Sequence, residues 1–232
     1  MDDMFAPEHL FELGSCPHRE LFSGCAGAWE ALEHLPEYLR SVLRPGIRGE
    51  VEDGAHIDGD VEIAEGARVE AGAYIRGPAI IGPGTEVRHG AYLRGNVLTG
   101  TDCVIGHASE CKAAILLDRA RAPHFAYVGD SVLGHEVNLG AGTRLANFKI
   151  VPGTVAVWRP DGTSVDTGLR KLGALLGDGV QIGCNAVTSP GTVIGRESIV
   201  YAGAVLRGTI PPGSIVRTAP GLVIGPRQAR SG

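Results

Sequence analysis

Four side chains stand out because their types and spacing suit phosphate binding and proton transfer. Arg76, Arg94 and Lys112 follow one another at equal intervals of eighteen positions, and His124 comes shortly after them. Clustered Arg and Lys side chains can hold a phosphate group, and a histidine can accept a proton near pH 7. The competing interpretation is a solvated basic stripe paired with nearby carboxylates, followed by an ordinary surface histidine. The choice between these interpretations depends on whether the fold brings the four residues together.

A repeat of six residues predicts that fold. Apolar side chains recur at every sixth position, and small or β-branched side chains come four residues after each of them. Neither an α-helix nor a plain strand has this period, but a solenoid of short parallel strands with three sides has it. The sequence therefore predicts an all-β fold, a left-handed parallel β-helix of hexapeptide repeats. The apolar positions include Val51, Ile57, Ile63, Val69, Ile75, Ile81, Val87, Leu93 and Ile105.

In such a β-helix, three segments of six residues complete one coil. Residues eighteen positions apart therefore lie one above the other, about 4.8 Å apart. The basic residues Arg76, Arg94 and Lys112 are then predicted to form one vertical stripe. Like charges this close repel one another unless carboxylates or a bound anion compensate them.

Breaks in the repeat define the domain organisation. Residues 1–45 have helical spacing and are expected to form a cap or arm, 46–217 the β-helix, and 218–232 a Gly/Pro-rich tail. The count slips at residues 118–124, which are expected to loop out and project His124. An insertion at about 148–172 contains Asp161-Gly162, a β-hairpin signal, and the hairpin at 154–167 is a candidate for reaching a neighbouring subunit.

Composition narrows the class of protein. The net charge of −5 gives no electrostatic basis for nucleic-acid binding, and no apolar stretch is long enough to cross a membrane. The acidic N-terminus lacks the basic region of a signal peptide, and the five cysteines form no CxxC pair. We therefore expect a cytoplasmic protein with reduced thiols. His89 and His107 are also one coil apart, which raises the alternative of a zinc enzyme, but the histidine spacings do not match that class and no metal is expected.

Three segments together resemble a known family. Residues 105–113, 123–130 and 137–148 resemble the acetyltransferase half of the bifunctional glucosamine-1-phosphate acetyltransferase/N-acetylglucosamine-1-phosphate uridylyltransferases. The resemblance implies a homotrimer, with acetyl-CoA as co-substrate and His124 as the general base. It implies that the sugar phosphate is bound by Arg94, Lys112, Tyr127, Asn138 and Asn147.

Cofactor contacts are expected at two further positions. Cys184 stands where the bacterial family has a serine that contacts acetyl-CoA, and it could pack against the pantetheine. In Gly140-Ala141-Gly142, small residues would let the substrate approach the backbone, so the N–H near Ala141 could hold the oxyanion. Residues 168–178, preceded by the hairpin, resemble the archaeal-type proteins of this group. Lys149 and Lys171 are candidates for the loop lysine of the bacterial family.

These observations predict an acetyl-CoA-dependent N-acetyltransferase for an amino-sugar phosphate, with glucosamine-1-phosphate as the leading substrate. Because residues 1–45 are too few for a nucleotide-binding domain, no nucleotidylyltransferase activity is expected from this chain. The alternative from another functional class is a non-catalytic or regulatory β-helix subunit that accompanies a separate sugar-1-phosphate nucleotidylyltransferase.

Overall fold

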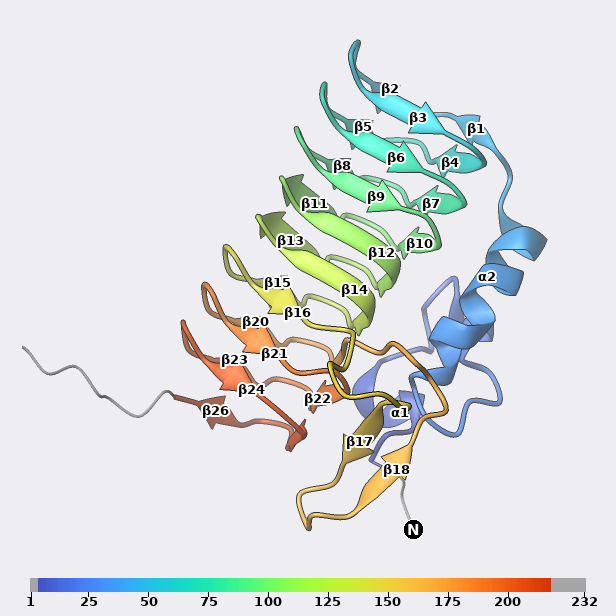
Figure 1. The fold of residues 1–232 in the computed structure, drawn as a ribbon. Coiled ribbons are helices and arrows are strands. Elements are labelled where there is room, and N and C mark those ends of the chain that lie inside the picture. The colour runs from blue at the N-terminus through green and yellow to red at the C-terminus, as the bar shows by residue number, and fades with distance from the viewer. Residues whose placement is uncertain (1–3, 218–232) are drawn as a thin grey trace, which may run out of the picture.

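A computed structural model describes residues 4–217 of the chain. From Gly46 onward the chain winds into the predicted left-handed parallel β-helix, whose short strands form three flat faces (Figure 1). Face 1 contains β3 (His56–Asp58), β6 (Tyr74–Arg76), β9 (Tyr92–Arg94), the first halves of β12 (Glu110–Leu116) and β14 (Tyr127–Leu133), β16 (Arg144–Leu145), β21 (Val187–Thr188) and β24 (Val205–Leu206).

The other two faces follow in the same coils. Face 2 contains β1 (Gly46–Ile47), β4 (Val61–Ile63), β7 (Ala79–Ile81), β10 (Val97–Thr99), the second halves of β12 and β14, β19 (Ala174–Leu176), β22 (Thr192–Ile194) and β25 (Thr209–Ile210). Face 3 contains β2 (Glu50–Val51), β5 (Arg68–Val69), β8 (Glu86–Val87), β11 (Val104–His107), β13 (Arg121–His124), β15 (Asn138–Leu139), β20 (Gln181–Ile182), β23 (Ile199–Val200) and β26 (Ile215–Val216).

The apolar positions of the repeat form the core between the three faces. Ile63, Ile81 and Ile105 are completely buried, and they belong to one continuous cluster along the coils. The early coils pair with the predicted offset of three hexapeptides, since Ile63 is in register with Ile81 and Ile75 with Leu93. Stacking therefore buries a column of side chains that no single coil could bury alone.

The prediction that residues 118–124 loop out of the coil is wrong. Val97 pairs with Ala114 and Ile105 with Ala122, so this coil is one residue shorter than the coils before it. The missing residue falls at the corner between faces 1 and 2, where Ala113 turns the chain alone with a φ of 46°. Asp130 turns the next coil in the same way, also with a φ of 46°. Residues 121–124 consequently form β13, a regular strand of face 3.

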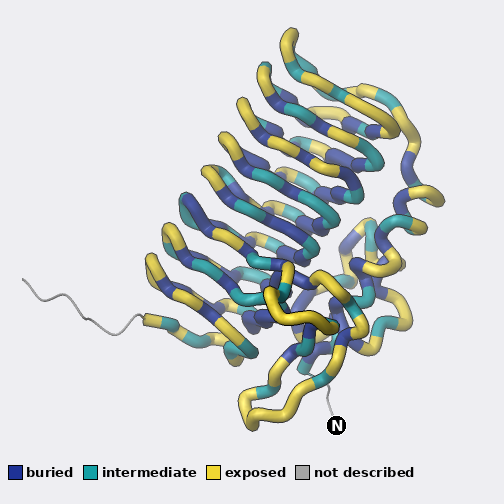
Figure 2. Tube along the Cα trace, viewed as in Figure 1, coloured by how far each residue is buried: buried dark blue, intermediate teal, exposed yellow. Residues whose placement is uncertain are grey.

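The N-terminal helices lie along a side of the β-helix. They are α1 (Pro7–Leu10), the 3-10 helix η1 (Arg19–Phe22) and α2 (Glu30–Val42), and they cover face 2 (Figures 1 and 2). Their apolar side chains share one buried cluster with Leu98, Ile115 and Val132, which point outward from face 2. Of the two expected forms, a cap or an arm, the segment therefore has the form of an arm that packs along face 2.

The insertion leaves the coil at the corner between faces 1 and 2 and returns to the same corner. The N–H of Leu172 donates to the carbonyl of Asn147 at 3.0 Å, which closes the coil beneath the insertion. Strands β17 (Ala156–Trp158) and β18 (Ser164–Asp166) form the predicted antiparallel hairpin. Val155 and Val157 are buried in the cluster of the N-terminal segment, so the hairpin packs on its own chain.

The predicted tail at 218–232 lies outside the described residues. Within residues 4–217, no helix is long and apolar enough to cross a membrane.

Candidate active site

The basic stripe forms on face 1 as the spacing predicts. Arg76 is in register with Arg94, and the pairing of Leu93 with Cys111 sets Lys112 on the next coil above Arg94. Two of these cations, Arg94 and Lys112, form an ion pair with a carboxylate on the next coil. Arg94 Nη1 lies 2.6 Å from Glu110 Oε1, and Lys112 Nζ lies 2.8 Å from Asp130 Oδ1. The carboxylates therefore offset the repulsion that stacked cations would otherwise suffer.

A polar cluster surrounds Lys112 at the edge of face 1. The carboxylate of Asp130 accepts hydrogen bonds from Lys112 Nζ through both oxygens, at 2.8 and 3.0 Å, and another from the side-chain amide of Asn147. The side chains of Lys112 and Asp130 are exposed by only 26% and 13%. Because charge-assisted bonds of this kind are strong when water is partly excluded, the three side chains hold one another in place.

Tyr127 completes this cluster above Gly129. A methyl group on Gly129 would lie 2.6 Å from Tyr127 Oη and 2.7 Å from Asn147 Nδ2, so both side chains cross directly over this glycine. Burial raises the pKa of the Tyr127 phenol, while the hydrogen bond from Asn147 acts in the opposite direction. The phenol therefore stays neutral near pH 7 and can both donate and accept a hydrogen bond.

His124 lies at the other edge of face 1, on the corner that follows face 3. The N–H of Gly142 donates to the carbonyl of His124 at 3.0 Å, and the N–H of Asn185 donates to the carbonyl of Ala141 at 2.8 Å. These bonds set His124, Ala141 and Cys184 on three successive coils of one corner. The His124 and Cys184 side chains are exposed. The predicted base and both predicted cofactor contacts thus form one accessible column.

The backbone of this column includes an unused donor. Gly140 and Gly142 both donate their N–H groups to neighbouring coils. The N–H of Ala141 makes no hydrogen bond within residues 4–217, so it is available to an oxyanion.

His89 and His107 continue the same corner below His124. Their rings are stacked, with centroids 5.6 Å apart and an interplanar angle of 11°. Each Nδ1 faces a backbone carbonyl of the preceding coil, that of Ala71 for His89 and that of His89 for His107. A nitrogen facing a carbonyl must carry a proton, so Nδ1 is the donor in each of these two bonds. No group of three His, Cys, Asp or Glu side chains among the described residues is placed to hold a metal ion.

Asn138 lies apart from the cluster. It belongs to face 3, in register with Arg121 and Gln181. Within one chain it is therefore on a different face from Lys112, Tyr127 and Asn147. The candidate lysines Lys149 and Lys171 lie on the insertion rather than on a face of the coil.

Sequence reasoning missed the partners that position the site. Glu110, Asp130 and Gly129 had no assigned role, although each lies inside a segment that carries the family resemblance. The separation of Lys112 and Asp130 equals that of Arg94 and Lys112, so the stacking rule applied once more would have brought Asp130 close to this lysine.

Comparison with known proteins agrees with the fold and with the family inferred from the sequence. The GMPPB C-terminal domain family matches residues 75–165, and the bacterial transferase hexapeptide family (six repeats) matches residues 173–208. Among solved structures, the UDP-N-acetylglucosamine acyltransferase of Francisella novicida aligns with a TM-score of 0.51 at 13% identity, covering 70% of this chain and 60% of that one. The chain is thus a left-handed β-helix protein of the hexapeptide-repeat class.

Within this class its sequence is related to proteins named GlmU. A bifunctional protein GlmU of Methanococcus maripaludis (strain C7) is 46% identical over 196 residues, which are 84% of this chain and 47% of the relative. A bifunctional sugar-1-phosphate nucleotidylyltransferase/acetyltransferase of Sulfurisphaera tokodaii is 39% identical over 158 residues, which are 68% of this chain and 39% of the relative. The chain spans about half the length, or less, of these curated relatives. The predicted resemblance to a GlmU-like acetyltransferase domain is confirmed.

Proposed function

We propose that this chain is an acetyl-CoA-dependent N-acetyltransferase that acts on an amino-sugar phosphate, with glucosamine-1-phosphate as the leading substrate. The observation that carries the proposal is the arrangement of face 1. One edge presents an exposed histidine in a column with Ala141 and Cys184, and the face itself presents Arg94 and the polar cluster around Lys112. Acyl transfer to a phosphorylated amine requires a proton acceptor and cationic side chains that can bind the phosphate.

In the proposed reaction, His124 accepts a proton from the sugar amine as its nitrogen attacks the thioester carbonyl. A C–N bond forms, the C–S bond breaks, and the proton passes from His124 to the departing CoA thiolate. The free N–H of Ala141 stabilises the negative charge on the carbonyl oxygen before the C–S bond breaks. Lys112 and Arg94 pair with the phosphate, and Tyr127 and Asn147 bind sugar hydroxyls.

The proposal includes a homotrimer in the cytoplasm. Asn138 lies on face 3, away from the cluster, and a neighbouring copy would bring this side chain to the cluster of the next subunit. Residues 4–45 form helices that cover face 2, and we expect no nucleotidylyltransferase activity from this chain.

The test is the release of free CoA from acetyl-CoA by the purified chain, with glucosamine-1-phosphate, galactosamine-1-phosphate or buffer alone. Turnover with one sugar phosphate supports the proposal and assigns the sugar. Absence of turnover with both in a folded protein favours the second candidate, a regulatory subunit for a separate sugar-1-phosphate nucleotidylyltransferase. The match of residues 75–165 to the GMPPB C-terminal domain family is the observation behind that candidate.

A further inference from the structure

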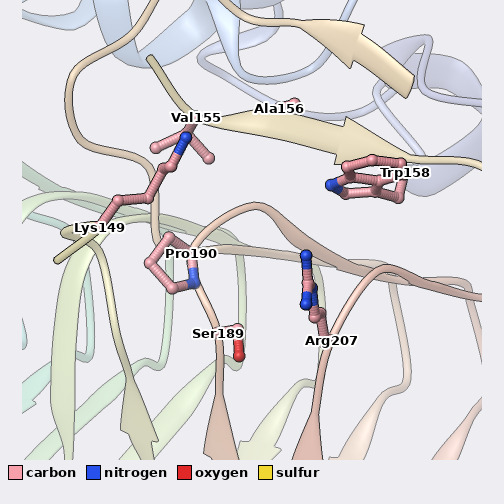
Figure 3. Close-up of a pocket in the computed structure, with 7 residues that line it drawn as sticks. All are labelled: Lys149, Val155, Ala156, Trp158, Ser189, Pro190 and Arg207. Atoms are coloured by element: carbon pink, nitrogen blue, oxygen red, sulfur yellow. The ribbon is translucent and has the colours of Figure 1, made fainter. Parts of the chain in front are cut away.

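A pocket separate from the site described above lies beneath the inserted hairpin. It has a volume of about 260 Å³ and opens between strand β17 and the later coils, near the corner of faces 1 and 2 (Figure 3). His124 lies on the opposite corner of face 1. The pocket is lined by Lys149, Val155, Ala156, Trp158, Ser189, Pro190 and Arg207.

Two cations reach this pocket from opposite sides (Figure 3). Lys149 Nζ donates to the carbonyl of Thr154 at 2.7 Å, and the Arg207 guanidinium lies 5.9 Å from the centre of the Trp158 ring. Neither cation forms an ion pair with a carboxylate within residues 4–217, unlike Arg94 and Lys112 on face 1. Two positive charges therefore face one small space in a protein whose net charge is −5.

One acidic group, Asp166, interacts with Lys149 at this pocket. Hydrogen bonds from Thr154 and Gly168 lower the pKa of Asp166, and Lys149 contributes a smaller effect. The Asp166 carboxylate thus stays ionised, accepts hydrogen bonds from Thr154 Oγ1 at 2.9 Å and from the N–H of Gly168 at 3.1 Å, and offsets part of the charge of Lys149, whereas Arg207 has no such partner within residues 4–217.

Backbone contacts hold the hairpin against the coil beside this pocket. The N–H of Gly191 donates to the carbonyls of Leu172 and Gly173, which anchors this turn of the coil. A methyl group on Gly191 would lie 2.7 Å from the carbonyl oxygen of Ala156 and 2.8 Å from Val155 Cγ1, so the hairpin packs directly on the coil there. Val155 is fully buried, whereas Trp158 remains 40% exposed and offers its ring to the pocket.

We propose that this pocket binds a nucleoside phosphate. The guanidinium of Arg207 and the ammonium of Lys149 pair with the phosphate, the hydroxyl of Ser189 donates to it, and the base packs along Trp158. The volume is below the roughly 300–1,000 Å³ of pockets for drug-sized ligands, so a mononucleotide fits better than a whole coenzyme. The proposal does not depend on His124 being the base of the proposed acetyl transfer.

The test is calorimetric titration of the full chain with AMP, UMP and inorganic phosphate. Arg207→Gln and Lys149→Gln are each expected to weaken nucleotide binding about tenfold or more, because each removes a charge-assisted hydrogen bond. Arg119→Gln is the matched control, since Arg119 pairs with Glu136 away from the pocket, and it is expected to bind as the wild type does. Absence of AMP and UMP binding in the millimolar range, or equal binding by all variants, would overturn the proposal.

Two further arms identify the source of the nucleotide and guard against misfolding. If Arg207→Gln weakens CoA binding by the same factor as AMP binding, the pocket holds the nucleotide end of the coenzyme; if CoA binding is unchanged, it holds a free nucleotide. Bound AMP should quench the fluorescence of the wild type, and Trp158→Phe should abolish that quenching while buried Trp29 still reports a folded protein. His124→Ala should retain AMP binding, which separates this proposal from the catalytic one.

Discussion

The substitution Gly129→Ala should disrupt the polar cluster around Lys112 while leaving the fold intact. Gly129 does not have a positive φ, so alanine introduces no backbone strain there. The new methyl group would lie 2.6 Å from Tyr127 Oη and 2.7 Å from Asn147 Nδ2, and the ends of both side chains must move away. Because these ends can rotate, we expect a loss of stability of about 1 kcal/mol.

The expected loss of activity is larger than this change in stability. Tyr127 and Asn147 would leave the positions from which they are proposed to bind sugar hydroxyls, and two such hydrogen bonds together contribute about 1–3 kcal/mol. Gly129→Ala should therefore lower kcat/KM for the amino-sugar phosphate by about ten- to a hundredfold, because each 1.4 kcal/mol is a factor of ten. The KM for acetyl-CoA should stay the same, since His124, Ala141 and Cys184 lie at the other edge of face 1.

Steady-state kinetics and thermal unfolding of Gly129→Ala measure both effects. Gly14→Ala is the matched control, because its methyl group would meet only the carboxylate end of Glu12. A stable Gly129→Ala protein with wild-type kcat/KM would refute the reasoning. If this variant unfolds, Tyr127→Phe is the second test, because it removes the Tyr127 hydroxyl without a clash. It should also lower kcat/KM for the sugar phosphate and leave the KM for acetyl-CoA unchanged.

Three other consequences concern the thiols and the packing of the N-terminal segment. Burial raises the pKa values of Cys103 and Cys111 to about 12, whereas an unfolded cysteine has a pKa near 8.5. The free energy of unfolding should therefore be unaffected by these thiols below about pH 8.5 and should fall as the pH rises toward 12, by about 1.4 kcal/mol per pH unit for each thiol. Urea unfolding at pH 7, 9 and 10 measures this slope, and Cys111→Ala should reduce it. Cys184 is exposed and should react first with a thiol reagent, and acetyl-CoA should slow that reaction; equal rates with and without acetyl-CoA would contradict its place in the cofactor column. Leu98→Ala should cost about 2–5 kcal/mol in urea unfolding because Leu98 is fully buried under the helices, whereas Ile150→Ala, at a side chain 97% exposed, should leave stability unchanged.

The sequence predicts the coil and the stripe because both depend only on spacing. Burial at every sixth position determines the repeat, and the offset of three hexapeptides then places Arg76, Arg94 and Lys112 in one column. The hairpin is equally local, since Asp161-Gly162 suits a tight turn between two short strands.

The shortened corner was hidden because two adjacent leucines are both buried. Leu116 points into the coil, while Leu117 packs outward beneath the N-terminal segment. Their side chains alone do not reveal which one points inward, so the slip in the six-residue repeat predicts a loop where the structure has a shortened corner. The position of the N-terminal helices could not be predicted for the same reason, because the outward residues of face 2 resemble core residues in the sequence.

The central claim is that His124 accepts a proton during acetyl transfer to an amino-sugar phosphate. The most direct measurement is the rate of CoA release from acetyl-CoA with glucosamine-1-phosphate and galactosamine-1-phosphate. It compares the wild type with His124→Ala at a temperature at which both proteins are folded. We predict turnover that depends on one of these sugars, and a loss of about a hundredfold or more in His124→Ala. Equal rates in the two proteins, or no turnover with either sugar by the folded wild type, would contradict the claim.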